Sequence, residues 1–595
     1  MWPRGPNRPS VWQPGYGFPR WALRVFGCCS ADWSNSLSEN ARMRSMSHLR
    51  LAARARFLIC GIPWFWPIVA FIYLFYIPYY AKLNNPNENA RVYQIRAVVE
   101  FQKLSVNEQI ARFGPTNDLA SVGNKLYSGK APGMTFVGIP VYAALHAIDT
   151  ARGSLPTSPF RLLYTLRLFG VLLPVLGFLI AFRRFLNRFG DNKQFFDFLT
   201  IVLATGTMLL PYSLIFVNHS LTAASACGSL MAAESFNDKM KRKIHFSAYL
   251  WIFLAGFLLA FSTAADHALF PISCLLLIYC VSRTGFSLLP IVFLCAGAFI
   301  PTAATAIYNH LCWGHLFKTS IGFLANPEFA KNQSQGLFGL VGPKAIAIYN
   351  LLISPAKGLF FFSPVLVFAP VALTYASARS QFKRMAVLSL IILCWMILYA
   401  CSLTNWDAGW TVGPRYATVI VPFGILGIGI GWSSIPSRIR AFCLPMFIVF
   451  SIISIIFTVS TSVLFPHLPP KSQNPVFELI WPLWRDGMTP HTLIEPCVVL
   501  SGRAAQVPFL LAFCGLLMTV LSKGVSVFGS NVGWLRSRFR KVVLGCVFMA
   551  VAGIFIYRVS TFRTPNRRTV LDTLTWIEKT IWEPKRSFTD GTSHQ

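Results

Sequence analysis

Two carboxylates stand out in the hydrophilic segment that follows the first apolar stretch of the sequence. Glu88 lies in PNENA, directly after that stretch, and Asp118 lies further along the same segment in TND. Such a pair suits group transfer, because one acid can take a proton from an acceptor hydroxyl while the other orients hydroxyl groups. Each acid also has a structural interpretation: Glu88 could stabilise the start of a helix, and Asp118 could form an Asx turn.

Basic side chains that could bind a phosphate occur at two further places. Lys130 stands just before a Pro-Gly break, and Arg415 begins another apolar segment in the motif GPRY. The planar guanidinium of arginine matches the oxygen atoms of a phosphate. The alternatives are an interfacial lysine whose stem lies along the membrane and an arginine that anchors a helix end, although positive anchors are expected on the cytoplasmic side.

Other candidates border apolar segments. An ionisable group at such a boundary is a functional hypothesis because its burial in lipid is costly, whereas an aromatic ring there can stack on a sugar or anchor the interface. Glu328 could shape an acceptor site or be an ordinary polar loop residue. No ligand spacing supports a metal site formed by Glu88, Asp118 and His219, so none is predicted. The further candidates are Tyr127, His219, Asp266, Glu328 and Trp406.

The composition indicates a membrane protein. Of the 595 residues, 54% are hydrophobic and 12% are charged, whereas soluble globular chains have about 25% charged residues. The apolar residues occur in blocks, which excludes an ordinary cytosolic enzyme, a disordered chain and a fibrous protein. The excess of 53 Lys and Arg over 21 Asp and Glu is explained by basic cytoplasmic loops that contact anionic lipid, so we expect no nucleic-acid partner.

Apolar blocks of about 20 residues predict an all-α polytopic protein with about thirteen transmembrane helices. Spans are expected near 57–80, 162–182, 195–215, 219–236, 246–264, 268–282, 286–308, 359–378, 385–403, 416–433, 440–464, 507–523 and 542–558. Basic segments that include Arg183, Lys241 and Arg384 mark the cytoplasmic side. The outer segments are then 81–133, 309–358, 404–415 and 465–506.

The first outer segment is expected to contain two helices that do not cross the membrane. Residues 90–101 have apolar side chains at three- and four-residue spacing, which predicts an amphipathic helix on the membrane surface. Residues 133–149 are apolar but short for a span, and counting them as one would place Arg183 outside. We therefore expect an interfacial or re-entrant helix there.

Seven stretches, in order, resemble the GT-C superfamily of integral-membrane glycosyltransferases, which contains the protein O-mannosyltransferases and the lipid A aminoarabinose transferase; the chain is most similar to a bacterial branch. The stretches are NENAR at 87–91, YSGKAPG at 127–133, TGTMLLPYSLIFVNH at 205–219, YN and WG within 308–314, ANPEFAKNQSQGLFG at 325–339, SPAKGLFFFSPVL at 354–366 and WDAGWTVGPRY at 406–416. The last third of the chain is similar to the family only in hydropathy.

This resemblance implies a GT-C type bundle in a bacterial inner membrane. It implies a sugar donor carried on a polyprenyl monophosphate, transfer with inversion on the outer face, and a glycan, lipid or protein acceptor. Glu88 matches the general base of the family, and Asp118 matches a second acid of the same loop. Lys130 and Arg415 match basic positions near the lipid phosphate. Arg91 and Lys357 could supply further positive charge, so no cofactor is required, although a divalent cation could bind.

These expectations divide the chain into four parts. Residues 1–56 form a basic cytoplasmic segment expected to be disordered, 57–433 the GT-C-like catalytic module, 434–558 C-terminal transmembrane helices, and 559–595 a tail. The alternative functions are a transporter or lipid flippase, which would place charged or helix-breaking groups near the middle of several spans, and a non-catalytic scaffold. The transferase hypothesis requires Glu88, Asp118, Lys130 and Arg415 to converge on one outer cavity.

Overall fold

The computed structural model describes residues 63–75, 85–470, 472–485, 490, 492–493 and 504–531, together with a few isolated positions between 550 and 572. This part of the chain is mostly helical, and it contains one two-stranded antiparallel sheet. The expected disordered N-terminal segment and the expected tail and last span lie wholly or largely outside the described residues.

The elements follow one another along the chain with short connections. The α-helices are α2 (Phe65–Phe75), α3 (Pro86–Phe101), α4 (Asn107–Phe113), α5 (Gly133–Ala151), α6 (Pro159–Arg167), α7 (Leu173–Leu186), α8 (Lys193–Thr205), α9 (Leu209–Ser213), α10 (His219–Lys241), α11 (His245–Ala265), α12 (Phe270–Arg283), α13 (Leu288–Trp313), α14 (Pro327–Ser334), α15 (Ala345–Leu352), α16 (Leu359–Phe362), α17 (Phe368–Arg379), α18 (Lys383–Ser402), α19 (Ile420–Ser434), α20 (Ser437–Leu464), α21 (Trp481–Arg485) and α22 (Val507–Asn531). The strands are β1 (Leu119–Val122) and β2 (Lys125–Ser128). Short 3₁₀ turns include η4 (His267–Leu269), η5 (Ser320–Phe323) and η7 (Arg415–Val419).

Eight helices among the described residues are long and apolar enough to cross a membrane, which supports a multi-pass membrane protein. They are Gly133–Ala151, Pro159–Phe189, His245–Ala265, Leu288–Trp313, Lys383–Ser402, Arg415–Ser434, Ser437–Leu464 and Ala504–Val527. Three shorter apolar helices are Phe65–Phe75, His267–Arg283 and Pro364–Arg379. The expected count of about thirteen spans is therefore not confirmed.

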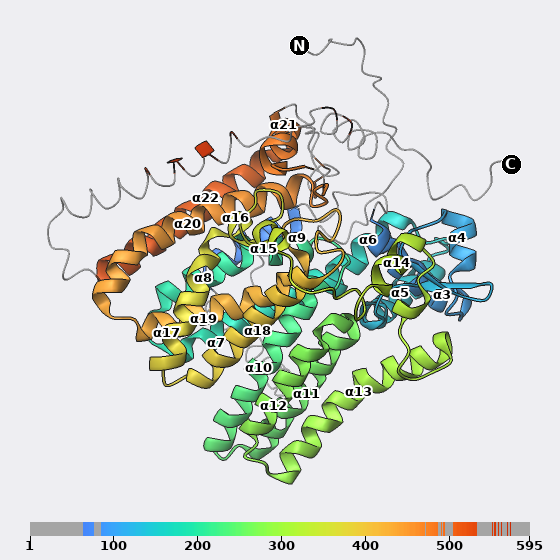
Figure 1. Ribbon diagram of the computed structural model, residues 1–595, viewed down its shortest axis with the longest axis horizontal. Coiled ribbons are helices and arrows are strands. Elements are labelled where there is room, and N and C mark those ends of the chain that lie inside the picture. The colour runs from blue at the N-terminus through green and yellow to red at the C-terminus, as the bar shows by residue number, and fades with distance from the viewer. Residues whose placement is uncertain are drawn as a thin grey trace, which may run out of the picture.

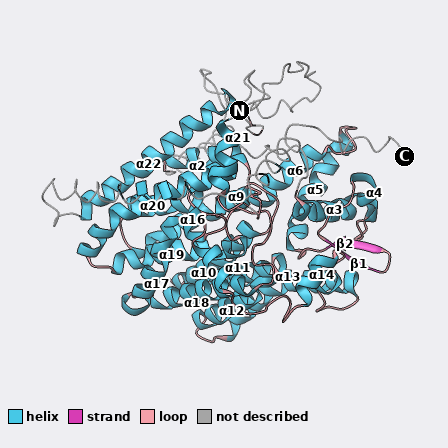
Figure 2. Cartoon of the chain, turned by 45° about the horizontal axis from the view of Figure 1, so that its top comes forward, coloured by secondary structure: helices cyan, strands magenta, loops and turns pink. Residues whose placement is uncertain are grey.

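The helices form one elongated assembly (Figure 1). Helices α8, α17, α19, α20 and α22 lie together, helices α10 to α13 form a second group, and α3 to α6 with α14 gather at one end. Figure 2 shows the two strands at the edge of this last group. Helix α19 lies in the interior, since almost every side chain from Ile420 to Trp432 is buried.

All four segments that the sequence places outside meet at one end, which we call the loop end. Ala120 bridges to Leu324, which joins the first segment to the second. The Thr404 N–H donates to the Gly339 carbonyl over 2.8 Å, and the Thr411 N–H donates to the Leu468 carbonyl over 2.9 Å. These contacts join the second, third and fourth segments. The described loops are thus arranged as one continuous surface, as the predicted topology requires.

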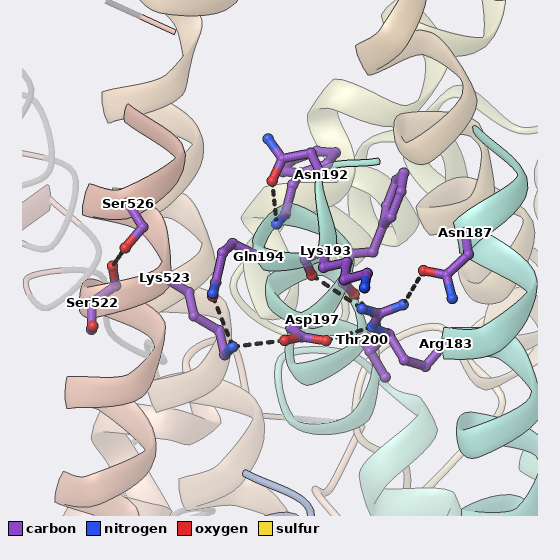
Figure 3. Close-up of polar contacts among 12 residues, drawn as sticks. Arg183, Asn187, Asn192, Lys193, Gln194, Asp197, Thr200, Ser522, Lys523 and Ser526 are labelled. Carbon is purple, nitrogen blue, oxygen red and sulfur yellow. Dashed lines mark hydrogen bonds and ion pairs between the residues drawn. The ribbon is translucent and has the colours of Figure 1, made fainter. Parts of the chain in front are cut away.

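The basic segments that the sequence places inside gather at the opposite end. Asp197 of α8 lies between Arg183 of α7 and Lys523 of α22, with N–O distances of 2.5 and 2.7 Å (Figure 3). Nearby helices are joined in the same way, because Glu234 of α10 pairs with Arg283 of α12 over 2.8 Å. These buried charges are paired, as burial requires.

Two expectations for the first outer segment need correction. The predicted surface helix is α3, but its side chains from Asn87 to Ala97 are nearly all buried, so α3 is packed inside the protein. Residues 133–149 form α5, whose 19 residues are long and apolar enough to cross a membrane, so the argument from insufficient length does not hold. Because α5 packs against α3 and α6 at the loop end, its position within the protein is still consistent with an interfacial helix.

Candidate functional site

The β-hairpin brings Asp118 and Lys130 together. The Gly129 N–H donates to the Asp118 carbonyl over 2.8 Å, directly beyond the Leu119–Ser128 pair. Lys130 Nζ then lies 2.8 Å from Asp118 Oδ1. A Cβ at Gly129 would stand 3.0 Å from the Asp118 carbonyl oxygen, so glycine permits this close approach. The result is an ion pair whose lysine and aspartate side chains are 24% and 11% exposed.

A second glycine of the motif YSGKAPG places this ion pair beside Asp266. A Cβ at Gly133 would stand 2.5 Å from the Ala265 backbone nitrogen, and the absence of a side chain therefore lets α5 begin against the end of α11. Asp266 is the next residue after α11. Burial raises the pKa of Asp266, although the Ala268 N–H and nearby positive charges oppose this effect.

Arg91 of α3 is linked to Asp266 through an asparagine. Its Nη2 donates to Asn218 Oδ1 over 2.9 Å, and Asn218 Nδ2 donates to Asp266 Oδ2 over 2.8 Å. Arg91 is 2% exposed, and burial lowers its pKa to about 10, which leaves it charged at neutral pH. Its buried Nε has no partner in the part of the chain that the structure describes.

Arg415 has the largest unused hydrogen-bonding capacity in this region. Its guanidinium lies over the Tyr416 ring, 5.2 Å from the centroid, and its Nη2 makes one long contact of 3.5 Å with the Tyr416 hydroxyl. No carboxylate among the described residues forms an ion pair with it, and its buried Nε has no partner there. A guanidinium has five N–H donors, so Arg415 can still bind an anion.

Arg91, Lys130 and Arg415 form what we call the cationic cluster, with Asp118 as its carboxylate. The positive charges act on one another and on Asp118. Burial lowers the pKa of Lys130 against the opposing effect of Asp118, and Arg415 and Arg91 lower it further. Three cations against one nearby carboxylate leave an excess of positive charge that favours an anionic ligand.

Glu88 occupies a different environment from the one expected. Its carboxylate is 1% exposed and accepts two hydrogen bonds from Arg167, over 3.0 and 2.8 Å. The Phe216 N–H donates to it over 2.5 Å. Burial alone would raise the pKa of Glu88, but the charge and hydrogen bonds of Arg167 hold it below its usual value. The carboxylate does not cap α3 either, because Asn85 accepts the Asn87 N–H there.

A low pKa and fully bonded oxygen atoms do not favour Glu88 as a general base. The geometry favours a positioning role, because Glu88 lies one turn before Arg91 on α3 and fixes that helix to α6 and to the segment before α10.

Lys357 lies near the cluster but is occupied. Its Nζ donates to the Gly409 carbonyl and, over 2.8 Å, to Thr411 Oγ1, so it supports the loop that carries Arg415. Burial lowers the pKa of Lys357 to about 7, although Asp407 opposes this effect. The expectation that Lys357 binds a phosphate directly is therefore replaced by a supporting role.

His219 is close to the cluster, whereas three other candidates are not shown to join it. His219 is buried, packs edge-on to Tyr212 at 5.1 Å and has Nδ1 4.0 Å from Asp266 Oδ2. Tyr127 packs against Trp313 in a separate apolar cluster. Glu328 is exposed in the first turn of α14, and Trp406 packs against α15 and α18.

Sequence reasoning did not identify Arg167, Asn218 or His467. Arg167 is an ionisable residue within an apolar run, and this signal could have singled it out. Asn218 precedes a residue that was chosen, and no pattern marks its two hydrogen bonds. His467 belongs to the last outer segment; burial lowers its pKa to about 4, against the opposing charge of Glu88. The C-terminal helices therefore contribute to the surroundings of Glu88.

No group of three or more His, Cys, Asp or Glu side chains with the geometry of a metal site occurs among the described residues. No protein-family model matches the sequence, and no curated protein is significantly similar to it. The interpretation of the site therefore depends on the arrangement of its own side chains.

Proposed function

We propose that the chain is an integral-membrane glycosyltransferase that moves a sugar from a polyprenyl monophosphate to an acceptor at the outer face of the membrane, as the GT-C enzymes do. The observation that carries this proposal is the convergence of Arg91, Lys130 and Arg415 around Asp118 at the loop end of an apolar helix assembly. These residues come from α3, the β-hairpin and η7, which are far apart in the sequence.

The phosphate of the donor would bind to the cationic cluster. Arg415 and Arg91 have buried N–H groups without partners in the described part of the chain, and Lys130 is partly exposed. Hydrogen bonds between cationic donors and phosphate oxygens are roughly twice as strong as neutral ones. As the bond to the sugar breaks, negative charge grows on the phosphate, and fixed cations in a partly dry site stabilise it.

The hydrocarbon chain of the donor would lie in apolar crevices that start beside Arg415. The first crevice is bordered by Pro414, Leu359 and Ile397, and the second shares Leu359 and Ile397 and continues along α18 and α19 to Gly424. A lipid whose phosphate is bound at Arg415 would thus find apolar surface next to its headgroup. A soluble phosphosugar would not need this surface.

Asp118 would be the general base. Its Oδ1 pairs with Lys130, and its Oδ2 has no partner in the described part of the chain. The acceptor hydroxyl oxygen attacks the anomeric carbon, its proton passes to Asp118, and the bond from the anomeric carbon to the phosphate oxygen breaks. Polyprenyl phosphate leaves with the bonding electron pair and is held by the cationic cluster. Glu88 acts through Arg91 and α3 as a positioning residue.

The experiment is a transfer assay with the full-length protein in proteoliposomes. Polyprenyl phosphates that carry radiolabelled sugars serve as donors, and cell-envelope extract supplies the acceptor. We expect Asp118→Asn to lower transfer by about 10²–10⁴-fold while polyprenyl phosphate still binds. The control is Asp238→Asn, which changes a carboxylate that is 42% exposed at the opposite end.

Normal transfer by Asp118→Asn would remove Asp118 from the mechanism. If the wild-type protein instead moved the intact lipid-linked sugar across the bilayer without forming a new glycosidic bond, the transferase proposal would be wrong and the flippase alternative would replace it.

A further inference from the structure

Helix α15 is apolar on both of its faces. Ala347 and Leu351 are buried against Ala400 and Cys401 of α18. On the opposite side Ile346, Ile348, Tyr349 and Ile353 are between 42% and 61% exposed. Its one polar side chain, Asn350, donates back to the Ile346 carbonyl of the same helix. A helix that is apolar all round is stable within a protein core or a membrane, not in water.

The loop that precedes α15 extends the same apolar surface. Leu337, Phe338 and Val341 are 68%, 67% and 42% exposed. The loop is fixed to the end of α18, because Leu340 bridges to Leu403 and the Val341 N–H donates to the Ser402 carbonyl over 2.8 Å. These exposed side chains are therefore held in place beside a helix that is apolar enough to span the membrane.

The exposed surface of α18 shows what covers this patch. Val387, Ile391, Trp395 and Leu398 are 39% to 50% exposed and follow one another at three- and four-residue spacing. In a membrane-spanning helix such a stripe faces lipid. Because α15 packs on the last turns of the same helix, the apolar surface continues from the stripe onto α15. The two surfaces are continuous, so the same hydrocarbon covers both.

We propose that α15 and the loop 337–341 are embedded in the membrane leaflet at the loop end, although the segment 309–358 as a whole was expected to lie in water. The partner of this surface is lipid acyl chains. Helix α14, in the same segment, has no buried residue and presents Glu328 and Lys331 at its surface, so it stays in water. In Figure 1, α15 lies with α16 near the spanning helices, whereas α14 lies among α3 to α5.

Photo-crosslinking tests this inference without reference to the proposed enzyme activity. The full-length chain, with benzoylphenylalanine in place of Tyr349, is reconstituted in nanodiscs whose phospholipids carry radiolabelled acyl chains. The control protein carries the same amino acid in place of Glu328. We expect several-fold more lipid adduct at position 349 than at 328. Ile353 provides a second position if the first variant does not fold.

Equal labelling at positions 349, 353 and 328 would overturn the inference. Crosslinking of position 349 to a second copy of the chain, with little lipid adduct, would also overturn it and would identify the apolar surface as a protein interface.

Discussion

The buried ion pair between Glu88 and Arg167 allows the positioning role of Glu88 to be separated from a catalytic role. Both side chains are 1% exposed, and two hydrogen bonds join them. Removing one partner of such a pair costs about 3–5 kcal/mol, because the other charge is left buried and uncompensated. We therefore expect Glu88→Gln and Arg167→Met each to lower the free energy of unfolding by about this amount.

The double variant Glu88→Gln/Arg167→Met should lose much less than the sum of the single losses, because it leaves no buried charge unpaired. The assay is unfolding in detergent micelles by titration with sodium dodecyl sulfate, followed by tryptophan fluorescence. Additive losses would refute the pairing argument. A Glu88→Gln protein with wild-type stability but no transfer activity would identify Glu88 as the base and contradict the role given to Asp118.

Three further variants test other parts of the structure. Because the pKa of Lys357 is about 7 when folded and about 10.4 when exposed, the folded state binds fewer protons between these values; stability should rise with pH there, and Lys357→Met should flatten that rise in melting experiments at pH 6 to 10, whereas an unchanged slope would contradict the assigned pKa. Lys523→Met removes one partner of the buried Asp197 (Figure 3) and should cost about 2–4 kcal/mol in the same detergent titration, since Arg183 remains as a partner; wild-type stability would contradict the structural role of this network. Glu328→Gln, on an exposed helix turn, should leave both stability and transfer unchanged, and a loss of transfer would show that the acceptor reaches α14.

The helices that could be predicted well are those with uninterrupted apolar runs. The expected span 440–464 corresponds to α20 (Ser437–Leu464), and 246–264 corresponds to α11 (His245–Ala265). The expected span 195–215 instead divides into α8 and the short α9, because Gly206 ends α8 and its N–H bonds back to Val202. Hydropathy averages over such a break, so it overestimates the number of long spans.

The β-hairpin was not predicted, although the sequence contains its signal. Gly123 and Asn124 separate two short runs, and Gly123 has a φ of +57°, which suits a tight hairpin turn. Because this hairpin sets Asp118 beside Lys130, missing it also meant missing the reason for their contact. Their types were predictable as acid and phosphate-binding base, but their pairing depends on the turn.

The environment of Glu88 could not be read from the sequence. Its interpretations as a helix-start acid or as a base used local spacing, whereas its partners are Arg167 and the Phe216 N–H. These contacts are made by the packing of α3 against distant segments. The same holds for Lys357, whose acceptors belong to the loop before Arg415. Tertiary contacts of this kind decide whether a buried charge is available for chemistry.

The central claim is that the cationic cluster binds the phosphate of a membrane lipid, and its most direct test is equilibrium binding of radiolabelled polyprenyl phosphate to the purified full-length protein. We predict saturable binding that weakens about tenfold or more in Arg415→Gln, since a hydrogen bond to a charged group contributes about 1.5–3 kcal/mol. The control Arg184→Gln, which changes an exposed arginine at the opposite end, should bind like the wild type. Equal affinity in the wild type and Arg415→Gln, or no saturable binding at all, would contradict the account.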